Sequence, residues 1–265
     1  MELRCDTVTA IPPPLLSWSK NPENLCSLEE IPVHWQKNDV LTFLADVGMY
    51  DATLYHDLDA AEKEQEQQFK SEYFKKRFTV SRNILRLVLH HIPGIGNNAD
   101  IVLTKEKNGR VGVNTRPDIF ISLSYSGSCI AITVGKRKIG SDIERVRPMA
   151  LRKIRSIPLF NSVTGRTRKD QNKKFLHRWT LLESYAKFHD MSVYPLTQDR
   201  YFLPDAHFVS YLIDQRYILS LASDAKPMKD ILLWIDPACK LASSGAGKKA
   251  TCSPPLPYGA TYVRA

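Results

Sequence analysis

The chain has 265 residues, which is enough for one large domain or two small ones, each burying a hydrophobic core. Hydrophobic residues make up 43% and charged residues 25%, as is usual for globular proteins, and no apolar run approaches the roughly 20 residues of a spanning helix. We therefore expect no membrane partner, and the formal net charge of +9 indicates an anionic one.

The beginning of the chain predicts little regular structure before a first helix. A proline run at residues 12–14 and weak periodicity predict an N-terminal extension over residues 1–31. Residues 33–35 are expected to open the first strand. Residues 59–68 are acidic and polar, and Asp59 is suited to cap a helix there.

A long helix and a hairpin are predicted next. Apolar residues at positions 74, 78, 85 and 89 share one helical face and predict an amphipathic helix over residues 69–91, ended by Pro93. Residues 101–103 and 111–113 flank an Asn108-Gly109 turn, which favours a β-hairpin.

The remaining elements repeat this order of a helix followed by strands. Short β-rich runs are found at residues 119–124, 130–134 and 139–143. A basic, irregular stretch over residues 148–171 precedes helical spacing over residues 175–188. Residues 201–208 and 217–222 predict closing strands. Residues 231–265 are rich in small residues and proline and predict a flexible tail.

Two motifs carry the chemistry. In the predicted strand over residues 139–143 and just after it, Asp142 and Glu144 alternate by two and so share a face. In the later helix, Trp179, Glu183 and Lys187 are four apart and form one ridge. Three carboxylates make a hard-oxygen site suited to Mg²⁺, and a lysine beside them suits a pyrophosphate. The pattern therefore indicates phosphoryl-group chemistry, although surface charges and an ordinary ion pair would also fit each motif taken singly.

Together, the motifs resemble the signature of 4'-phosphopantetheinyl transferases of the larger Sfp type. That family has an (I/V)GxDxE block followed by WxxxExxxK, which residues 139–144 and 179–187 match. Residues 122–126 stand where the family has a serine-histidine-serine segment, and residues 108–110 stand where it has a G-(K/R)-P turn. The resemblance covers roughly residues 32–225, in the right order and spacing.

The resemblance implies an α+β fold of two pseudo-symmetric halves. Each half is expected to be a small antiparallel sheet packed with a long helix, with the active site between the halves. We place the halves at residues 32–137 and 138–230, and we expect a monomer. The implied activity is Mg²⁺-dependent transfer of 4'-phosphopantetheine from coenzyme A to a serine of an apo acyl or peptidyl carrier protein, releasing 3',5'-ADP. Carriers of fatty-acid, polyketide and nonribosomal peptide synthesis all fit.

The resemblance also implies a role for each site residue. Asp142, Glu144 and Glu183 are the expected Mg²⁺ ligands, and Glu183 and Lys187 the expected catalytic residues. The coenzyme A ligands are expected among side chains that donate hydrogen bonds or carry positive charge, namely Arg82, Arg86, Arg110, Ser124, Tyr125, Ser126 and Lys187.

Two residues depart from the family pattern. Tyr125 replaces the usual histidine, and a tyrosine donates a hydrogen bond but brings no positive charge. Leu182 replaces the usual lysine before the helix glutamate. These departures keep open a degenerate relative that binds coenzyme A or a carrier without transfer.

A nucleic-acid-binding protein is the second alternative. Lysines and arginines concentrate in residues 70–86, 145–155 and 166–178, and basic patches are typical of such proteins. These stretches lack the interleaved aromatic residues of a known module, so we expect no nucleic acid partner. The five cysteines lack metal-like spacing and no apolar run follows the start, which predicts a cytoplasmic protein with free thiols.

Overall fold

The computed structural model describes residues 15–18, 25–50, 58–95, 101–105, 109–150, 160, 163–198, 205–224 and 230–235. The strands are β1 (Leu15–Trp18), β2 (Leu25–Cys26), β3 (Val40–Asp46), β4 (Leu103–Lys105), β5 (Val111–Val113), β6 (Phe120–Ser126), β7 (Cys129–Gly135), β8 (Ile139–Arg145), β9 (His207–Ile213), β10 (Tyr217–Ser223) and β11 (Asp230–Ile235). The α-helices are α1 (Ile31–Lys37), α2 (Ala60–Gln67), α3 (Glu72–His90), α5 (Arg168–His189) and α6 (Tyr194–Gln198), with short 3₁₀ turns at Leu28–Glu30 and Val47–Met49.

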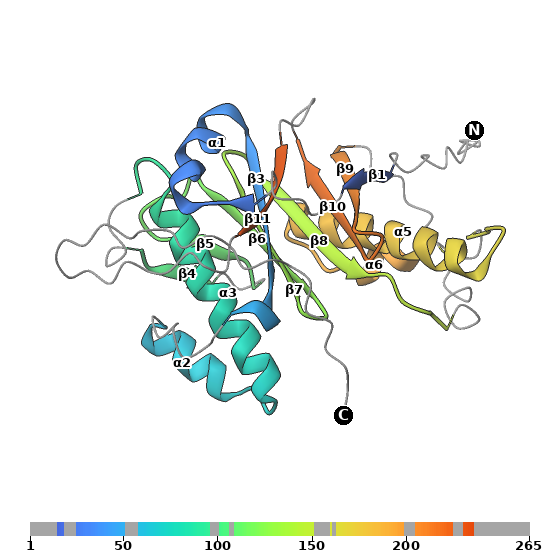
Figure 1. Cartoon of the computed structure of the whole chain (residues 1–265), viewed down its shortest axis with the longest axis horizontal. Helices are drawn as coiled ribbons and strands as arrows, with labels where there is room; N and C mark the ends of the chain where they lie inside the picture. The colour runs from blue at the N-terminus through green and yellow to red at the C-terminus, as the bar shows by residue number, and fades with distance from the viewer. Residues whose placement is uncertain are drawn as a thin grey trace, which may run out of the picture.

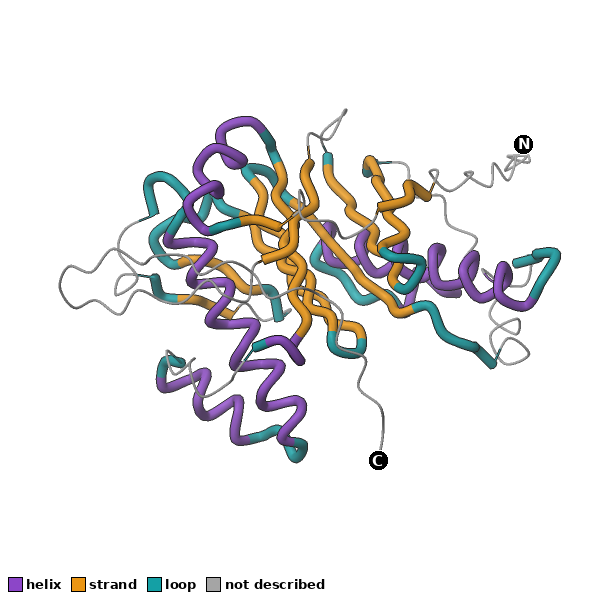
Figure 2. The backbone as a smooth tube through the Cα atoms, viewed as in Figure 1, coloured by secondary structure: helices purple, strands orange, loops and turns teal. Residues whose placement is uncertain are grey.

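Two main sheets lie face to face (Figures 1 and 2). The larger sheet has the order β2-β11-β3-β7-β6, and the smaller one has the order β1-β9-β10-β8. β4 and β5 form a separate antiparallel pair. β6 and β8 are therefore edge strands of different sheets, and the short turn after β7 leads the chain from one sheet to the other.

Three apolar cores lie between four layers. α1 and α3 pack on the outer face of the larger sheet. The inner faces of the two sheets pack on each other through residues of β3, β7, β8, β9, β10 and β11. α5 covers the outer face of the smaller sheet. β7 and β10 are buried along their whole length because both of their faces are covered.

The α+β class predicted from the sequence is confirmed, as are the cap at Asp59, the long helix and the hairpin. The Asp59 side chain accepts a hydrogen bond from the Glu62 N–H, and Glu62 caps Asp59 in return. The pseudo-symmetry and the boundary at residues 137 and 138 stay predictions. The sheets are also not purely antiparallel, since β11 pairs in parallel with β3. No helix in the described part of the chain combines the length and apolar composition needed to cross a membrane.

Besides the start of α5, which lies at Arg168 and not near residue 175, three predictions made from the sequence differ from the structure. Residues 33–35 lie in α1 and not in a strand, because Pro32 favours a helix start and Ile31 and Trp35, four apart, both face the core. The strand expected over residues 201–208 is β9, which begins at His207, and residues 201–204 lie outside the described residues.

The third difference concerns the two ends of the chain. Residues 231–235 were assigned to a flexible tail, but they form most of β11, in which four consecutive residues from Leu232 to Ile235 are buried. Residues 15–18 and 25–26 of the predicted N-terminal extension form β1 and β2. Residues 236–265 lie outside the described residues.

Candidate functional site

Three serine side chains join the edge strands β6 and β8. The hydroxyl oxygens of Ser122, Ser124 and Ser126 accept hydrogen bonds from the backbone N–H groups of Ser141 (2.9 Å), Ile143 (3.1 Å) and Arg145 (2.8 Å), respectively. The three serines alternate by two along β6, so all of them face β8. Where the two sheets meet, serine side-chain oxygens thus accept the hydrogen bonds that backbone carbonyl oxygens accept in a regular β-sheet. We call these three residues the serine ladder.

The serine ladder also holds the two carboxylates of β8. Ser124 Oγ donates to Asp142 Oδ1 at 2.7 Å, and Ser126 Oγ donates to Glu144 Oε2 at 2.8 Å. Asp142 is buried and Glu144 is partly exposed. Ser124 and Ser126 therefore each hold both the backbone of β8 and the carboxylate beside them.

Gly140 explains how α5 comes close enough to these carboxylates. A Cβ atom on Gly140 would overlap the carbonyl oxygen of Ser184 and the backbone nitrogen of Phe188. Only glycine lets the α5 backbone lie against β8 here, and this contact brings Glu183 and Lys187 next to Asp142. The glycine of the strand motif and the helix motif thus meet in space.

The contacts of Lys187 and the pKa values of the acids show how closely the two motifs interact. Lys187 Nζ donates to Asp142 Oδ1 at 2.8 Å and to the Ser141 carbonyl oxygen at 2.9 Å. Burial raises the pKa of Asp142, and Glu144 adds to the rise, while Lys187 and Ser124 oppose it. Burial also raises the pKa of Glu183, and the charges of Asp142 and Glu144 raise it further against Lys187.

We call Asp142, Glu144, Glu183 and Lys187 the carboxylate cluster. Its donor set fits Mg²⁺ in kind, because hard carboxylate oxygens are the ligands this ion takes. A divalent cation would also relieve the repulsion from Asp142 and Glu144 that adds to the effect of burial on the pKa of Glu183. Within the described residues, however, no three His, Cys, Asp or Glu side chains are gathered tightly enough to hold a metal ion as they stand. Metal binding here would therefore require these carboxylates to come closer together.

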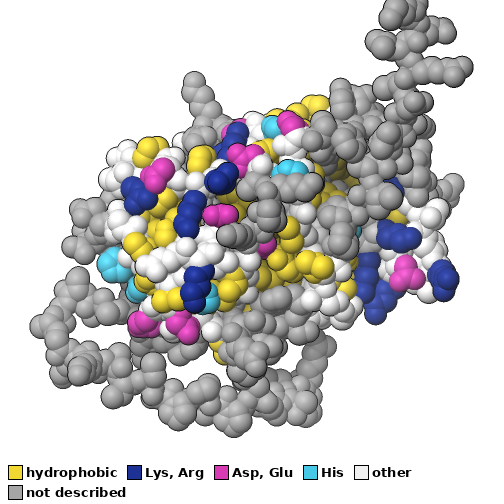
Figure 3. Space-filling model, turned by 90° about the horizontal axis from the view of Figure 1, so that it is seen from above, with side chains coloured by type: hydrophobic (Ala, Val, Ile, Leu, Met, Phe, Trp, Pro, Cys, Tyr) yellow, Lys and Arg dark blue, Asp and Glu magenta, His cyan; other side chains and the backbone are white. Residues whose placement is uncertain are grey.

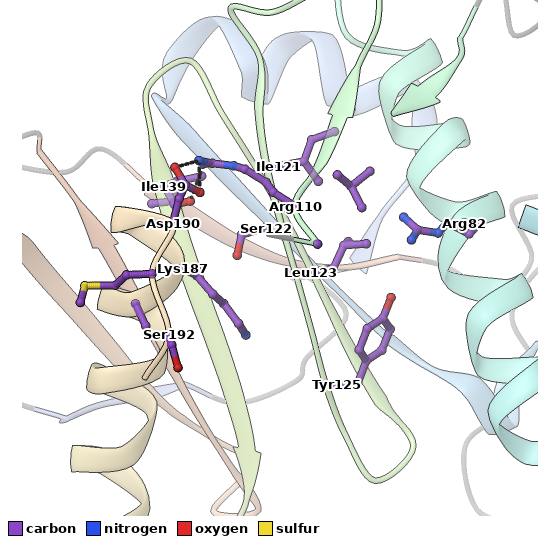
Figure 4. A pocket seen from close by; sticks show the side chains of 14 residues that line it. Arg82, Arg110, Ile121, Ser122, Leu123, Tyr125, Ile139, Lys187, Asp190 and Ser192 are labelled. Atoms are coloured by element: carbon purple, nitrogen blue, oxygen red, sulfur yellow. Dashed lines mark hydrogen bonds and ion pairs between the residues drawn. The ribbon is translucent and has the colours of Figure 1, made fainter. Parts of the chain in front are cut away.

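A cavity of about 490 Å³ opens beside the carboxylate cluster (Figure 4). One wall comes from α3, β5 and β6, and the other comes from β8 and the end of α5. Its charged lining residues are Arg82, Arg110, Lys187 and Asp190. Figure 4 shows Arg82 and Lys187 on opposite sides of this space, one on α3 and the other on α5.

The predicted coenzyme A ligands fall into two groups. Arg82, Arg110, Tyr125 and Lys187 line the cavity, and Ser122 lines it too although the sequence did not single it out. Ser124, Ser126 and Arg86 are not among the lining residues, and the two serines bond to the carboxylates of β8 instead. The binding roles of all these residues stay predictions.

Arg82 and Arg86 belong to a second ionic group, which we call the arginine cluster and which also contains Asp59 and Glu62. Arg86 Nη2 lies 2.5 Å from Glu62 Oε2 and 3.5 Å from Asp59 Oδ2, and Arg82 Nε lies 3.6 Å from Glu62 Oε1. Both guanidinium groups are buried, and Nε and Nη1 of Arg82 have no hydrogen-bond partner among the described residues. The cluster fastens α2 to α3, and Arg82 reaches the cavity from it.

The two departures from the family pattern have clear surroundings. The Tyr125 hydroxyl lies 3.0 Å from Ser81 Oγ, and the Arg77 guanidinium lies 4.9 Å from the centre of the Tyr125 ring. The Tyr125 side chain is thus uncharged, but the guanidinium of Arg77 lies over its ring. Leu182 is buried in the core between α5 and the smaller sheet, where a lysine would be costly.

Comparisons with known proteins agree with the motifs. No protein-family model matches the chain. The 4'-phosphopantetheinyl transferase Sfp of Bacillus subtilis (strain 168) is 25% identical over 94 residues, which cover 34% of this chain and 42% of the relative. The 4'-phosphopantetheinyl transferase ffp of Bacillus subtilis is 27% identical over 94 residues with the same coverage.

A third relative is the 4'-phosphopantetheinyl transferase psf-1 of Bacillus pumilus, 24% identical over 115 residues that cover 42% of this chain and 49% of the relative. The matched segment thus spans less than half of each relative's length. The resemblance to Sfp-type 4'-phosphopantetheinyl transferases is confirmed, at low identity and over part of the chain.

Proposed function

We propose that this chain transfers 4'-phosphopantetheine from coenzyme A to a serine of an apo acyl or peptidyl carrier protein and releases 3',5'-ADP. The observation that carries the proposal is the carboxylate cluster, in which the strand motif and the helix motif meet at one edge of the cavity. The similarity to three proteins named as such transferases supports it.

The chain's own residues supply acid–base and electrostatic chemistry in this proposal. Glu183 takes the proton from the carrier serine hydroxyl, whose oxygen forms a bond to the phosphorus that bears the pantetheine arm. The bond from that phosphorus to the bridging oxygen of the pyrophosphate breaks, and the departing 3',5'-ADP keeps the electron pair. Lys187 stabilises the charge that develops on this leaving group.

A metal ion completes the proposed site. Asp142, Glu144 and Glu183 would hold Mg²⁺, which when bound neutralises charge on the pyrophosphate. The serine ladder would keep Asp142 and Glu144 oriented toward the ion, since Ser124 and Ser126 already donate to them. Arg82, Arg110 and Tyr125 would bind the nucleotide portion from the cavity wall.

A basic surface at the start of α5 supports an acidic protein partner. Figure 3 shows Lys and Arg side chains gathered at the right-hand end of the molecule, where α5 begins in Figure 1. Exposed side chains there include Arg166, Arg168, Lys169 and Lys174. We propose that this surface attracts an acidic carrier and speeds its encounter with the enzyme.

The test is the intact mass of an apo carrier protein after incubation with this protein, coenzyme A and Mg²⁺. Gain of one phosphopantetheine, lost when EDTA is added, is the expected result. Carriers from fatty-acid, polyketide and nonribosomal peptide systems should be tried in parallel. No gain on any of them would refute transfer. Coenzyme A binding without transfer would then favour the degenerate relative, and tight, strongly salt-dependent binding to DNA or RNA would favour the nucleic-acid-binding alternative.

A further inference from the structure

Asp190, directly after α5, has a backbone conformation that favours glycine. Its φ of 57° and ψ of 38° place it in the left-handed region, where helices commonly end on glycine. Aspartate tolerates this region better than most residues, but it still costs free energy relative to glycine. The carboxylate at this position therefore needs an explanation other than the turn.

The Asp190 carboxylate binds two cations that come from other parts of the chain (Figure 4). Arg110 Nη1 donates to its two oxygens at 2.8 and 3.0 Å, and Lys138 Nζ lies 2.8 Å from Oδ2. Arg110 directly precedes β5, and Lys138 lies between β7 and β8. Arg110 also donates to the Ile139 carbonyl oxygen at 3.2 Å. The carboxylate thus ties the hairpin on one wall of the cavity to the end of α5 on the other.

Arg110 and Lys138 also interact favourably with the C-terminal end of α5. The C-terminal end of a helix carries partial negative charge and attracts cations, and α5 ends at His189, the residue before Asp190. Lys138 Nζ also lies 5.8 Å from the centre of the Phe188 ring. Arg110 and Lys138 are therefore expected to remain beside α5 when a substitution removes the charge of Asp190.

We infer that Asp190 is an internal counter-ion that a phosphate-bearing ligand displaces from Arg110 and Lys138 when it enters the cavity. Asp190 and Arg110 both line that cavity, together with Arg82 and Lys187. Among the residues that line the cavity, an anion meets three cations and one opposing carboxylate, that of Asp190. Asp190 thus lowers the affinity for anions and couples their binding to release of the contact across the cavity. The inference rests on the proposed function only for the identity of the nucleotide ligand, coenzyme A.

Calorimetric binding of inorganic pyrophosphate and of coenzyme A, without Mg²⁺, tests this inference. Asp190→Asn keeps a side chain that tolerates the left-handed region but removes the charge, and Asp190→Gly suits the backbone and removes the carboxylate altogether. The matched control is Asp118→Asn, which makes the same change of net charge. Asp118 pairs with Arg116 at the surface, and neither residue lines the cavity.

We expect both Asp190 variants to bind pyrophosphate and coenzyme A about tenfold more tightly than the native chain, because one close opposing charge is gone. Uncharged pantetheine should bind all variants alike. Pyrophosphate affinities of the Asp190 variants no better than that of Asp118→Asn would overturn the inference, and so would absence of pyrophosphate binding to every variant. Tighter pyrophosphate binding by a protein that transfers nothing to any carrier would uphold the inference and refute the proposed function.

Discussion

Two ionic clusters lie beside the cavity, and they differ in their balance of charge. The arginine cluster pairs two guanidinium groups with two carboxylates, and its ion pairs hold α2 on α3. The carboxylate cluster has three acids and only two neighbouring cations, since Lys187 pairs with Asp142 and Arg147 pairs with Glu144. Burial raises the pKa of Glu183, and the charges of Asp142 and Glu144 raise it further. A balanced buried cluster fastens elements together, whereas a surplus of one sign marks a place where a counter-charge is expected to bind.

The largest expected effect comes from breaking the carboxylate cluster. Glu183→Gln removes the proposed base and one proposed metal ligand while keeping the size of the side chain. Transfer to a carrier should fall by about 10²–10⁴-fold, with little loss of thermal stability because Glu183 is only partly buried. Transfer kinetics together with a melting curve check this. A folded variant with native kinetics would exclude Glu183 as the base.

The same Glu-to-Gln substitution in the arginine cluster should lower stability strongly and transfer only weakly. Glu62→Gln leaves Arg82 and Arg86 buried with one charge partner fewer. The free energy of unfolding should drop by about 3 kcal/mol, and transfer by the protein that remains folded should fall by less than about tenfold. Denaturant unfolding and initial rates corrected for the folded fraction measure the two effects. A stable variant that has lost transfer would show that the arginine cluster carries chemistry.

The serine ladder joins the carboxylate cluster to β6. Substitutions at two of its members distinguish orientation of a carboxylate from support of the fold. Ser124→Ala and Ser122→Ala each remove the acceptor for one β8 N–H group, so each should lower stability by about 1–3 kcal/mol. Only Ser124 contacts a carboxylate of β8 among this pair. We expect the apparent affinity for Mg²⁺ in the transfer assay to weaken more for Ser124→Ala. Equal weakening would mean that the ladder acts only through the fold.

The smallest expected effect concerns the dependence of stability on pH and comes from a buried histidine of α5. His177 of α5 is buried, and burial, helped by Arg178, lowers its pKa to about 4. In the unfolded chain this histidine is protonated below about pH 6.5, whereas in the folded chain it stays neutral until about pH 4. The free energy of unfolding therefore decreases as pH falls from about 6.5 toward 4, by at most about 3 kcal/mol. His177→Gln should flatten this part of the profile of unfolding free energy against pH. An unchanged slope in the variant would assign the loss to other groups.

Local patterns predicted the elements that carry both clusters, but some cues in the sequence were overlooked. α5 begins at Arg168, well before the expected residue 175, and Thr167 with Asp170 forms the capping box that signals this start. Likewise, Ser122, Ser124 and Ser126 repeat by two as Asp142 and Glu144 do, which is the signal for the serine ladder.

Other features depend on contacts that are distant in the sequence. The partner of Arg110 is Asp190, eighty residues later, and no spacing rule joins them. β11 pairs in parallel with β3, which lies far away in the sequence, and its short apolar run was assigned to the tail because of the small residues and prolines that follow it. The need for glycine at position 140 is evident only from the close contact of β8 with the α5 backbone. The positions of the motifs could be read from sequence, whereas the ion pairs and the layer order required the folded chain.

The central claim is that the carboxylate cluster is a metal site and the arginine cluster is not. Calorimetric titration of Mg²⁺ into the native chain, Glu183→Gln and Glu62→Gln, each in the presence of coenzyme A, tests it most directly because both variants make the same chemical change. The account predicts binding to the native chain, retained binding to Glu62→Gln and at least tenfold weaker binding to Glu183→Gln. Equal Mg²⁺ affinity for Glu183→Gln and the native chain would contradict it.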